Sequence, residues 1–456
     1  MRTLGSENGQ SLMIVLLCIV ILLGFVALAT DVGILFYTKR QLQSIADSAA
    51  IGGASVIPCN VAGTGGSLAS GCPSVIMAAQ IDAQGGVTTG ANGTSGTVLG
   101  NGVTLFANHP PVYGPKAGNS NYVEAIACQN APVFFMNLFM PVNNSCTGGT
   151  TSWTGKLPVT ARSVAFWGAG QGCLYTLGTS GTTIFISGSS INLQATQCGI
   201  YDNSSASNAI FISGSSDTIN AKSIGVVGDK TISGSNDTIT PTPVSGIVPV
   251  SDPLVYLSPP SAGTCSGSLI ITSSMTVPAG YCSLTISGSG YTVTIPAGTY
   301  SGGITISGST DNVTFNTGTY ILSSGSLTVS GSSDTVSGNG VTFYVAGTGA
   351  VIISGSSNTF NLTAPTSGTY NGILFFQDRS DSASDTIGGS TDTLSLYGAL
   401  YFPDAALTIS GSTVSSNLYV DLIVKSVTFS GSSITLKDYA TLSGVTSPVG
   451  AATLVE

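Results

Sequence analysis

Residues 211–219 read FISGSSDTI, and this pattern recurs throughout the second half of the chain. Close copies or shorter forms of it stand at 185–190, 231–239, 285–290, 305–313, 328–336, 352–360, 408–413 and 428–436. The central glycines of consecutive copies lie 26 residues apart at Gly188 and Gly214, and 20 apart at Gly214 and Gly234. A repeat of this length is typical of a solenoid, in which each repeat forms one coil and stacks on its neighbours.

The residues around the motif predict the type of coil. Short runs of alternating β-branched residues, such as TVTI at 292–295, are bounded by Gly, Ser and Asn, and no helical pattern of useful length interrupts them. Short strands that complete their backbone hydrogen bonds with coils about 4.8 Å above and below form a parallel β-helix. We therefore expect a mainly β protein, with a right-handed parallel β-helix from about 170 to 445 inside a passenger of residues 169–456.

The central glycine of each motif is expected at a corner of the coil, where the chain turns sharply between strands. Glycine tolerates a positive φ that costs other residues roughly 1 kcal/mol or more. These repeat-corner glycines are Gly188, Gly214, Gly234, Gly288, Gly308, Gly331, Gly355, Gly411 and Gly431. The two long steps, Gly234 to Gly288 and Gly355 to Gly411, predict degenerate or looped coils, and residues 240–260 form the most irregular stretch.

The composition excludes some classes of function. Only 7% of the 456 residues are charged and 60 are glycine, whereas roughly 25% are charged in ordinary soluble domains. A net charge of -9 with only 11 Lys and Arg leaves no basic stripe that could neutralise a phosphate backbone. We therefore expect no nucleic-acid partner.

The nine cysteines suggest disulfides in an oxidising compartment. Cys18 lies in an apolar segment, and the other eight would pair in sequence order, although spacing alone leaves other connectivities open. The sequential pairs are Cys59–Cys72, Cys128–Cys146, Cys173–Cys198 and Cys265–Cys282. Because no CxxC pair occurs and His109 is the only histidine, a Cys/His zinc site has little support. We expect no metal-binding residue and no cofactor.

The N-terminal segment predicts a membrane anchor. Ser11 to Ala29 form an uncharged apolar run of 19 residues, close to the roughly 20 that a helix needs to cross the hydrocarbon. From 32 to 54, apolar residues recur at three- and four-residue steps, which predicts a continuing amphipathic helix. A cleavable signal peptide is the competing interpretation, but the helical pattern continues past the run without a break. We expect a single-pass anchor in residues 1–54, with a cytoplasmic N-terminus and the bulk periplasmic or extracellular.

Residues 9–54 closely resemble the N-terminal segment of the TadE/TadG-like proteins of Flp (tight adherence) pilus assembly. The resemblance rests on DVG at 31–33, RQLQ at 40–43 and the ending ADSAAIGGA at 46–54. It extends to NYVEAIACQNAPVFFMNLFM at 121–140 and LPVTARSVAFWG at 157–168. It implies a small pseudopilin-like α+β domain completed by residues 55–168, and partners in the pilus or secretion platform. Glu7 precedes the apolar run, whereas TadE-like pseudopilins carry a Glu within it, so we expect the helix to stay attached.

Candidate chemical sites are few. Asp217, Asp237, Asp311 and Asp334 share one repeat position, where each could bond its own backbone in a turn or all could form a Ca²⁺-binding ladder, and the turn is favoured. DRSDS at 378–382 has the D-x-S-x-S form of a von Willebrand A metal site, but no helical pattern follows it, which favours an exposed turn. Tyr and Phe in the GTY and LFF segments are expected in the core.

These observations favour a membrane-anchored, pilus-assembly-associated envelope protein with an exported structural or adhesive β-helix. Lys and Arg are too scattered after residue 170 to build a glycan-cleaving site, so we expect no catalytic residue and no enzyme. The expected partners are the membrane, pilus or secretion-platform proteins and surface glycans. The alternative is a displayed β-helix that binds or degrades polysaccharides, which would require acidic or basic side chains to converge on one groove.

Overall fold

The structure is a computed structural model of the chain. It describes residues 8–55, 57, 75, 78–79, 97–99, 102–120, 122–135, 146, 156–169, 172–247, 249–411, 415–431, 434–443, 445 and 447–455. The chain divides into two compact units, one of residues 1–168 with 452–456 and the other of residues 169–451.

The first unit is built on one long helix, α1 (Asn8–Ser55). It runs without a break through Gly24 and Asp31, which confirms the predicted continuity of the apolar and amphipathic parts. Most large apolar side chains between Met13 and Leu28 are exposed, as in a helix whose partner is lipid. By length and composition this helix can cross a membrane once.

A sheet of order β1-β2-β3-β4-β33, antiparallel from β1 to β4, packs against the second half of α1. Its strands are β1 (Thr97–Val98), β2 (Thr104–Asn108), β3 (Tyr122–Pro132), β4 (Lys156–Ala169) and β33 (Gly450–Leu454). Small residues of the helix, Ala46, Ala49 and Ala50, are fully buried and let the sheet approach closely. Whether this unit is pseudopilin-like, as the resemblance implies for residues 55–168, stays a prediction.

Strand β33 places the end of the chain in the first unit. The backbone N–H of Val455 donates to Val164 O on β4 at 2.9 Å. The passenger predicted as 169–456 therefore loses its last residues to the sheet of the anchor unit, because a short extended segment completes the free edge of β4.

The second unit is a parallel β-solenoid of about 11 turns, as the repeats predict. Its first block comprises β5 (Gly172–Thr176), β6 (Ile184–Ser189), β7 (Asn192–Asp202), β8 (Ile210–Ser215), β9 (Thr218–Val226), β10 (Lys230–Ile232), β11 (Thr238–Thr240) and β12 (Val244–Ser245). The second block begins with β13 (Ser268–Ile271), β14 (Met275–Thr276), β15 (Ser283–Ile286), β16 (Thr292–Ile295), β17 (Gly298–Thr299), β18 (Gly303–Ile306), β19 (Asn312–Phe315), β20 (Gly318–Leu322), β21 (Leu327–Val329) and β22 (Thr335–Asn339). It continues with β23 (Val341–Val345), β24 (Val351–Ile353), β25 (Thr359–Thr363), β26 (Ile373–Gln377), β27 (Asp385–Gly389), β28 (Thr393–Tyr397), β29 (Ala399–Gly411), β30 (Ser415–Tyr419), β31 (Leu422–Gly431), β32 (Ile434–Lys437) and the 3₁₀ turn η1 (Tyr439–Thr441).

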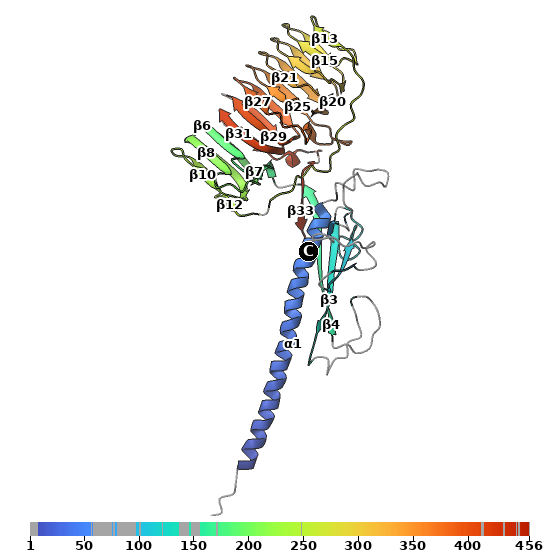
Figure 1. The fold of residues 1–456 in the computed structure, drawn as a ribbon, viewed down its shortest axis with the longest axis vertical. Coiled ribbons are helices and arrows are strands. Elements are labelled where there is room, and N and C mark those ends of the chain that lie inside the picture. The colour runs from blue at the N-terminus through green and yellow to red at the C-terminus, as the bar shows by residue number, and fades with distance from the viewer. Residues whose placement is uncertain are drawn as a thin grey trace, which may run out of the picture. The chain divides into compact units, whose positions relative to one another are not determined.

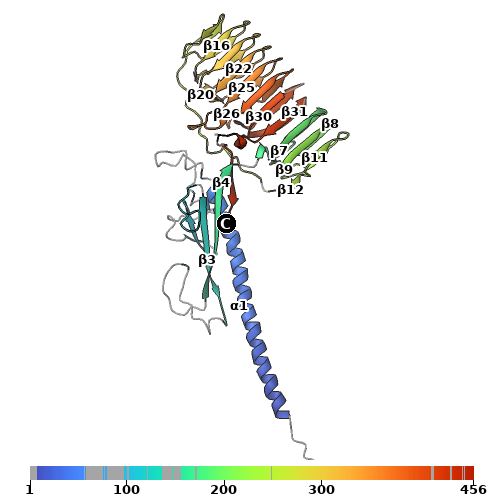
Figure 2. The same cartoon turned by 180° about the vertical axis from the view of Figure 1, so that it is seen from behind.

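The coils do not stack in chain order. Strand β31, near the end of the second block, pairs in parallel with β5 and β6 at the start of the first block. The column in Figures 1 and 2 therefore runs from β13 through β31 to β6, and ends at β10 and β12. The chain enters this column in the middle, builds one end, and returns to build the rest from the other end.

The return path is residues 249–267, which we call the strap. The strap follows the outside of the column (Figure 1), and its successive residues bond coils of the second block in turn. Asp252 Oδ2 accepts from Tyr401 Oη at 2.5 Å, Ser258 O accepts from Tyr370 Oη at 2.9 Å, and Gly263 N donates to Thr299 Oγ1 at 2.7 Å. The sequence predicted degenerate or looped coils in this irregular region, but after β12 it is a linker that spans the column.

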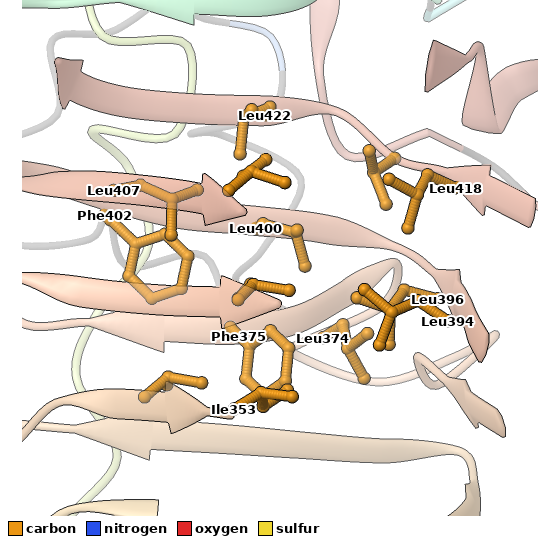
Figure 3. Packing of buried hydrophobic residues seen from close by; sticks show 14 of the residues in the cluster. Ile353, Leu374, Phe375, Leu394, Leu396, Leu400, Phe402, Leu407, Leu418 and Leu422 are labelled. Atoms are coloured by element: carbon orange, nitrogen blue, oxygen red, sulfur yellow. The ribbon is translucent and has the colours of Figure 1, made fainter. Parts of the chain in front are cut away.

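Inward-facing side chains fill the column from end to end. Ile286, Ile306, Val329, Ile353 and Ile387 occupy one register and are all at most 1% exposed. Each buried aliphatic side chain contributes roughly 1.5–3 kcal/mol of transfer free energy. Figure 3 shows the continuation of this core around Phe375 and Phe402, with leucines from neighbouring coils between them.

Aromatic residues stack along the same core. Tyr320 and Phe343 stack with ring centroids 5.1 Å apart, and the stack continues to Phe375 at 5.6 Å. All three are fully buried, so the expectation that the GTY and LFF aromatics belong to the core is correct for Tyr320 and Phe375.

Candidate functional site

The central glycines of the repeat motif form a continuous column. Gly188 pairs in register with Gly214, and Gly411 with Gly431. Bridges between the serines that follow the glycines continue the alignment along the remaining coils. Gly389 fills the long step between Gly355 and Gly411, pairs with Gly411, and was not predicted. Its motif reads GGST in place of SGST, and the serine, threonine and aspartate that follow it are the signal that could have identified it.

The reason for glycine differs from the predicted one at many corners. Gly214, Gly308 and Gly331 do not have a positive φ; instead the residue two positions later does, as at Ser216 and Ser333 with φ of 62° and 59°. Glycine is needed because of close approach. A Cβ at Gly331 would lie 2.0 Å from Asp334 Oδ2 and 2.5 Å from Gly308 O in the next coil.

The aspartates three residues after these glycines form a ladder between coils. Asp311 Oδ1 accepts from Tyr291 N at 2.7 Å, Asp334 Oδ1 from Asp311 N at 2.9 Å, and Asn358 Oδ1 from Asp334 N at 2.9 Å. Asp217 and Asp237 repeat the pattern in the first block. The prediction that each side chain bonds its own backbone is wrong, because the carboxylate folds back over glycine and reaches the neighbouring coil.

The ladder is an interior feature. Asp217, Asp311 and Asp334 are at most 1% exposed, and their Oδ2 atoms make no hydrogen bond to the described residues. Burial raises the pKa of Asp334 above its ordinary value, and the backbone N–H of Asp311 partly opposes this. Within the described residues, no group of three or more His, Cys, Asp or Glu could hold a metal ion.

Two other interior carboxyls have strongly raised pKa values. Burial raises the pKa of Asp385 to about 8, against the opposing hydrogen bond from Val351 N. Burial also raises the pKa of Asp421 to about 7, although the Ser447 hydroxyl donates to its Oδ2 at 2.6 Å. Both side chains are at most 1% exposed, so neither can exchange a proton directly with a bound polymer.

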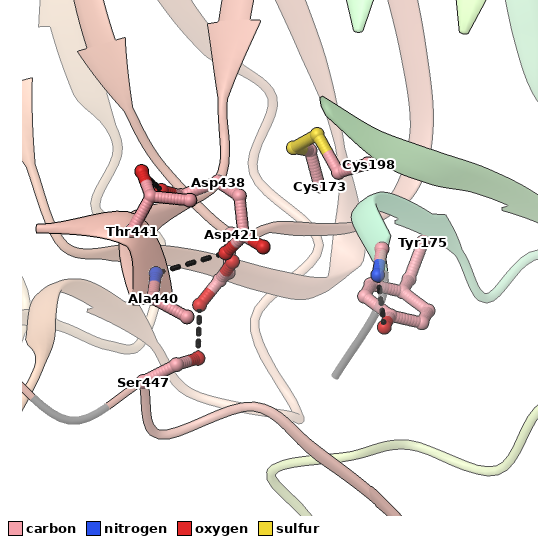
Figure 4. Close-up of a disulfide and its surroundings, with 9 residues drawn as sticks. Cys173, Tyr175, Cys198, Asp421, Asp438, Ala440, Thr441 and Ser447 are labelled. Atoms are coloured by element: carbon pink, nitrogen blue, oxygen red, sulfur yellow. Dashed lines mark hydrogen bonds between the residues drawn. A yellow bond between two sulfur atoms is a disulfide. The ribbon is translucent and has the colours of Figure 1, made fainter. Parts of the chain in front are cut away.

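Asp421 lies at the junction where the two blocks of the solenoid meet (Figure 4). Nearby, the Asp438 carboxylate accepts from Ala440 N at 2.8 Å and caps η1. The disulfide Cys173–Cys198 joins β5 to β7 in the adjoining coils, on the first-block side. The strand pairing of β31 with β5 and β6 joins the two blocks, while the disulfide and the side-chain caps stabilise the coils on either side of the junction.

Three disulfides are present among the described residues, Cys128–Cys146, Cys173–Cys198 and Cys265–Cys282. Each joins two cysteines that follow one another in chain order, as predicted. Cys265–Cys282 ties the end of the strap to the start of β15, next to the end coil of the column. The predicted pair Cys59–Cys72 lies outside the described residues, and Cys18 is free and exposed.

The DRSDS segment holds the strap. Asp378 Oδ1 accepts from Ser380 N at 2.9 Å and from its hydroxyl at 2.6 Å, which closes a tight turn. Arg379 reaches out of this turn and donates to Leu254 O at 2.5 Å and to Leu257 O at 3.0 Å. The predicted turn is present, and its arginine clamps two carbonyls of the strap.

The outer surface of the sheet that contains β16, β19, β22, β25 and β28 is a regular exposed surface of the solenoid. Alternate residues of each strand point outward, and the outward positions of successive coils are in register. We call this surface the hydroxyl–amide face. Its outer row is Thr292, Asn312, Thr335, Thr359 and Thr393, and its second row is Thr294, Thr314, Ser337, Asn361 and Ser395.

Hydroxyls and amides on this face stand on a nearly constant lattice. Coils repeat about every 4.8 Å, and residues two apart along a strand are separated by about 6.6 Å. The outer row is exposed and the second row is half-buried, except at the exposed Asn361. None of its ten members is charged. Such a surface can form many neutral hydrogen bonds to a polymer that carries repeated hydroxyl groups. The sequence contained the signal, a Thr, Asn or Ser at alternate positions after each aspartate, but its exposure was not predicted.

The comparisons with known proteins concern the helix. Residues 9–56 match the family described as "Putative Flp pilus-assembly TadE/G-like". The N-terminal helix carries a TadE/G-like domain. The match ends at 56, whereas the sequence resemblance was expected to extend to about 168. The comparisons with curated proteins and with solved structures found no match. A TadE/G-like helix joined to a β-solenoid fits a membrane-anchored, pilus-associated protein.

Proposed function

We propose that this protein is an adhesive component of the cell envelope, associated with pilus assembly, and that the hydroxyl–amide face of its exported solenoid is the adhesive surface. The TadE/G-like domain at residues 9–56 supports the association with the pilus machinery, and the exposed apolar part of α1 supports single-pass anchoring. The disulfides support an oxidising compartment for the solenoid. In the proposed orientation the N-terminus is cytoplasmic and the solenoid is exported.

The observation that carries the adhesive role is the charge-free lattice of Thr, Ser and Asn on five consecutive coils. A single exposed hydroxyl gains little when it exchanges water for a ligand, because the net contribution of one hydrogen bond is about 1 kcal/mol. Ten residues held in register act together, and their summed contributions give useful affinity for a repetitive target. The target class is a neutral, hydroxyl-rich polymer such as a polysaccharide, and no bond is broken.

The test is binding of the purified full chain, in detergent or nanodiscs, to insoluble neutral polysaccharides. The double variant Thr335→Val and Thr359→Val removes two hydroxyls but keeps β-branched residues of the same shape. At about 1 kcal/mol per hydrogen bond, we expect binding to weaken roughly tenfold to thirtyfold. The matched control is Thr305→Val with Thr328→Val, which makes the same change on β18 and β21, outside this face.

Salt and product assays separate this proposal from its rivals. Binding through neutral groups should change little between low and high ionic strength, because screening acts on charges. Equal loss of binding in both double variants would contradict the assignment of the face. Released reducing ends or unsaturated products would show that the solenoid is an enzyme. Deletion of the gene with no effect on attachment, pilus assembly or envelope integrity would refute the function as a whole.

A further inference from the structure

The Asp31 carboxylate lies where the apolar part of α1 ends. Asp31 is fully buried, two residues after the apolar run of 11–29. Its Oδ1 accepts from Phe134 N at 2.9 Å and its Oδ2 from Phe135 N at 2.7 Å. A buried carboxylate requires such donors, because an unpaired charge out of water is very costly. The two bonds fix the backbone of Phe134 and Phe135 at the level of Asp31 on the helix.

The phenylalanine side chains, in contrast, point away from the protein. Phe134 is 66% exposed and Phe135 is 48% exposed. Two adjacent, exposed aromatic residues on a fixed backbone are unusual on a surface that faces only water. The residues beside them on α1 toward the N-terminus, such as Phe25 and Leu28, are also exposed and form the membrane-crossing surface.

The position of Phe134 and Phe135 along the membrane normal follows from the geometry of α1. With a rise of about 1.5 Å per residue, Asp31 lies about 3 Å beyond the last apolar residue of the run. This is the headgroup and interfacial layer of a bilayer, where aromatic side chains are enriched. On the neighbouring strand, Lys156 is exposed and lies opposite Pro132, just before the phenylalanines. A cation at this level suits lipid phosphates.

We propose that Phe134 and Phe135 form a second membrane contact, inserted into the boundary between the lipid headgroups and acyl chains on the side where α1 leaves the bilayer, and that Asp31 is the residue that positions it. The ligand is a lipid leaflet, because the exposed phenylalanines continue the exposed apolar surface of the helix. A helix alone leaves its domain free to tilt and rotate, whereas a helix with a lateral aromatic contact fixes the orientation of β3 and β4 relative to the membrane plane. The proposal rests on the anchoring of α1 in the proposed function.

The experiment measures the depth of single tryptophans in the full chain, reconstituted into phosphatidylcholine vesicles that contain lipids brominated along the acyl chain. Each variant carries one reporter in a background with Trp153→Phe and Trp167→Phe. The fluorescence of Phe134→Trp and Phe135→Trp should be quenched most by lipids whose bromines lie near the headgroup. Its emission maximum should also lie to the blue of that of a tryptophan exposed to water. Tyr113→Trp is the matched control.

Tyr113 is an exposed aromatic residue of the same unit but far from the proposed contact. The Tyr113 carbonyl accepts a hydrogen bond from Arg162, and Arg162 also binds Glu124 on β3. Glu124 lies eight residues before Pro132 on this strand, so the two residues are about 27 Å apart at about 3.4 Å per residue. The Tyr113→Trp reporter should keep its emission. Quenching at Phe134 and Phe135 no greater than at Tyr113 would overturn the proposal, and protection of the two phenylalanines only in the presence of assembly proteins would assign the surface to a protein.

A further pair of variants separates the loop from the anchor. Phe25→Trp reports on the helix itself, and if it is not quenched, the anchoring has failed rather than the loop contact. When Asp31→Ala is added to each reporter protein, quenching of the tryptophan in Phe135→Trp should fall. Quenching of the tryptophan in Phe25→Trp should stay the same. Asp31→Asn retains one acceptor oxygen and should restore part of the loop signal. Unchanged quenching of Phe135→Trp in Asp31→Ala would refute the positioning role.

Discussion

Replacing Asp385 with Asn should remove the pH dependence of local stability where β24 pairs with β27. Asp385 lies at the start of β27, is fully buried, and accepts the backbone N–H of Val351 on β24 at 2.7 Å. Its other oxygen makes no hydrogen bond to the described residues. Burial, helped by the charge of Asp381 and opposed by the hydrogen bond from Val351 N, raises the pKa of Asp385 to about 8. The side chain is therefore neutral in the folded protein at pH 7.

The sign of the effect follows from proton binding in the two states. The unfolded chain loses this proton near pH 4, whereas the folded protein retains it to about pH 8. Between these values the folded state binds more protons, so stability falls as the pH rises. The slope is about 1.4 kcal/mol per pH unit, or roughly 3 kcal/mol between pH 5 and pH 7. The contribution is fully present below pH 4 and is lost above the folded pKa.

The assay is hydrogen exchange of the full chain from pH 5 to pH 8, because stability in a solenoid is local and the Val351 amide reports on this bond. In the wild type, the opening free energy of Val351, corrected for intrinsic exchange, should fall with pH. Asp385→Asn keeps the acceptor oxygen and does not titrate, so its profile should be nearly flat. Asp229→Asn is the control, because that carboxylate is exposed and its pKa is lowered by the backbone N–H of Lys230. An unchanged slope in Asp385→Asn would refute the reasoning.

Three further results are expected. Gly331→Ala should destabilise its coil and the adjacent coils by about 1–3 kcal/mol, because the new methyl group meets both Asp334 and the backbone of Gly308. Faster hydrogen exchange confined to those coils is the expected result, and global unfolding would contradict it. Arg379→Ala should release the strap, which limited proteolysis would detect as new cleavage within 249–267 while the strands stay protected. Thiol labelling of the denatured, unreduced protein should modify Cys18 alone, and labelling elsewhere would count against export.

The sequence alone determined the coil. Motifs such as FISGSSDTI at 211–219 combine a turn with alternating apolar positions, and local chain geometry then places one face inside and one outside. The membrane anchor could also be predicted from the sequence, because an apolar run of 19 residues that continues into a helical pattern is typical of a membrane-spanning helix. The disulfide pairs among the described residues followed chain order because each closes a short loop.

Only the tertiary structure decided which coil lies on which. Nearly identical repeats offer nearly identical edges, so the motif around Thr428 could pair with many partners, yet it stacks on Phe185, more than half the chain away. That choice makes the strap necessary, and it explains why Arg379 binds backbone carbonyls near residue 254. The aspartate ladder and the loop at Asp31 have the same origin. Their hydrogen bonds join residues distant in sequence, and a carboxylate with several possible donors is assigned to one only when packing brings that donor to it.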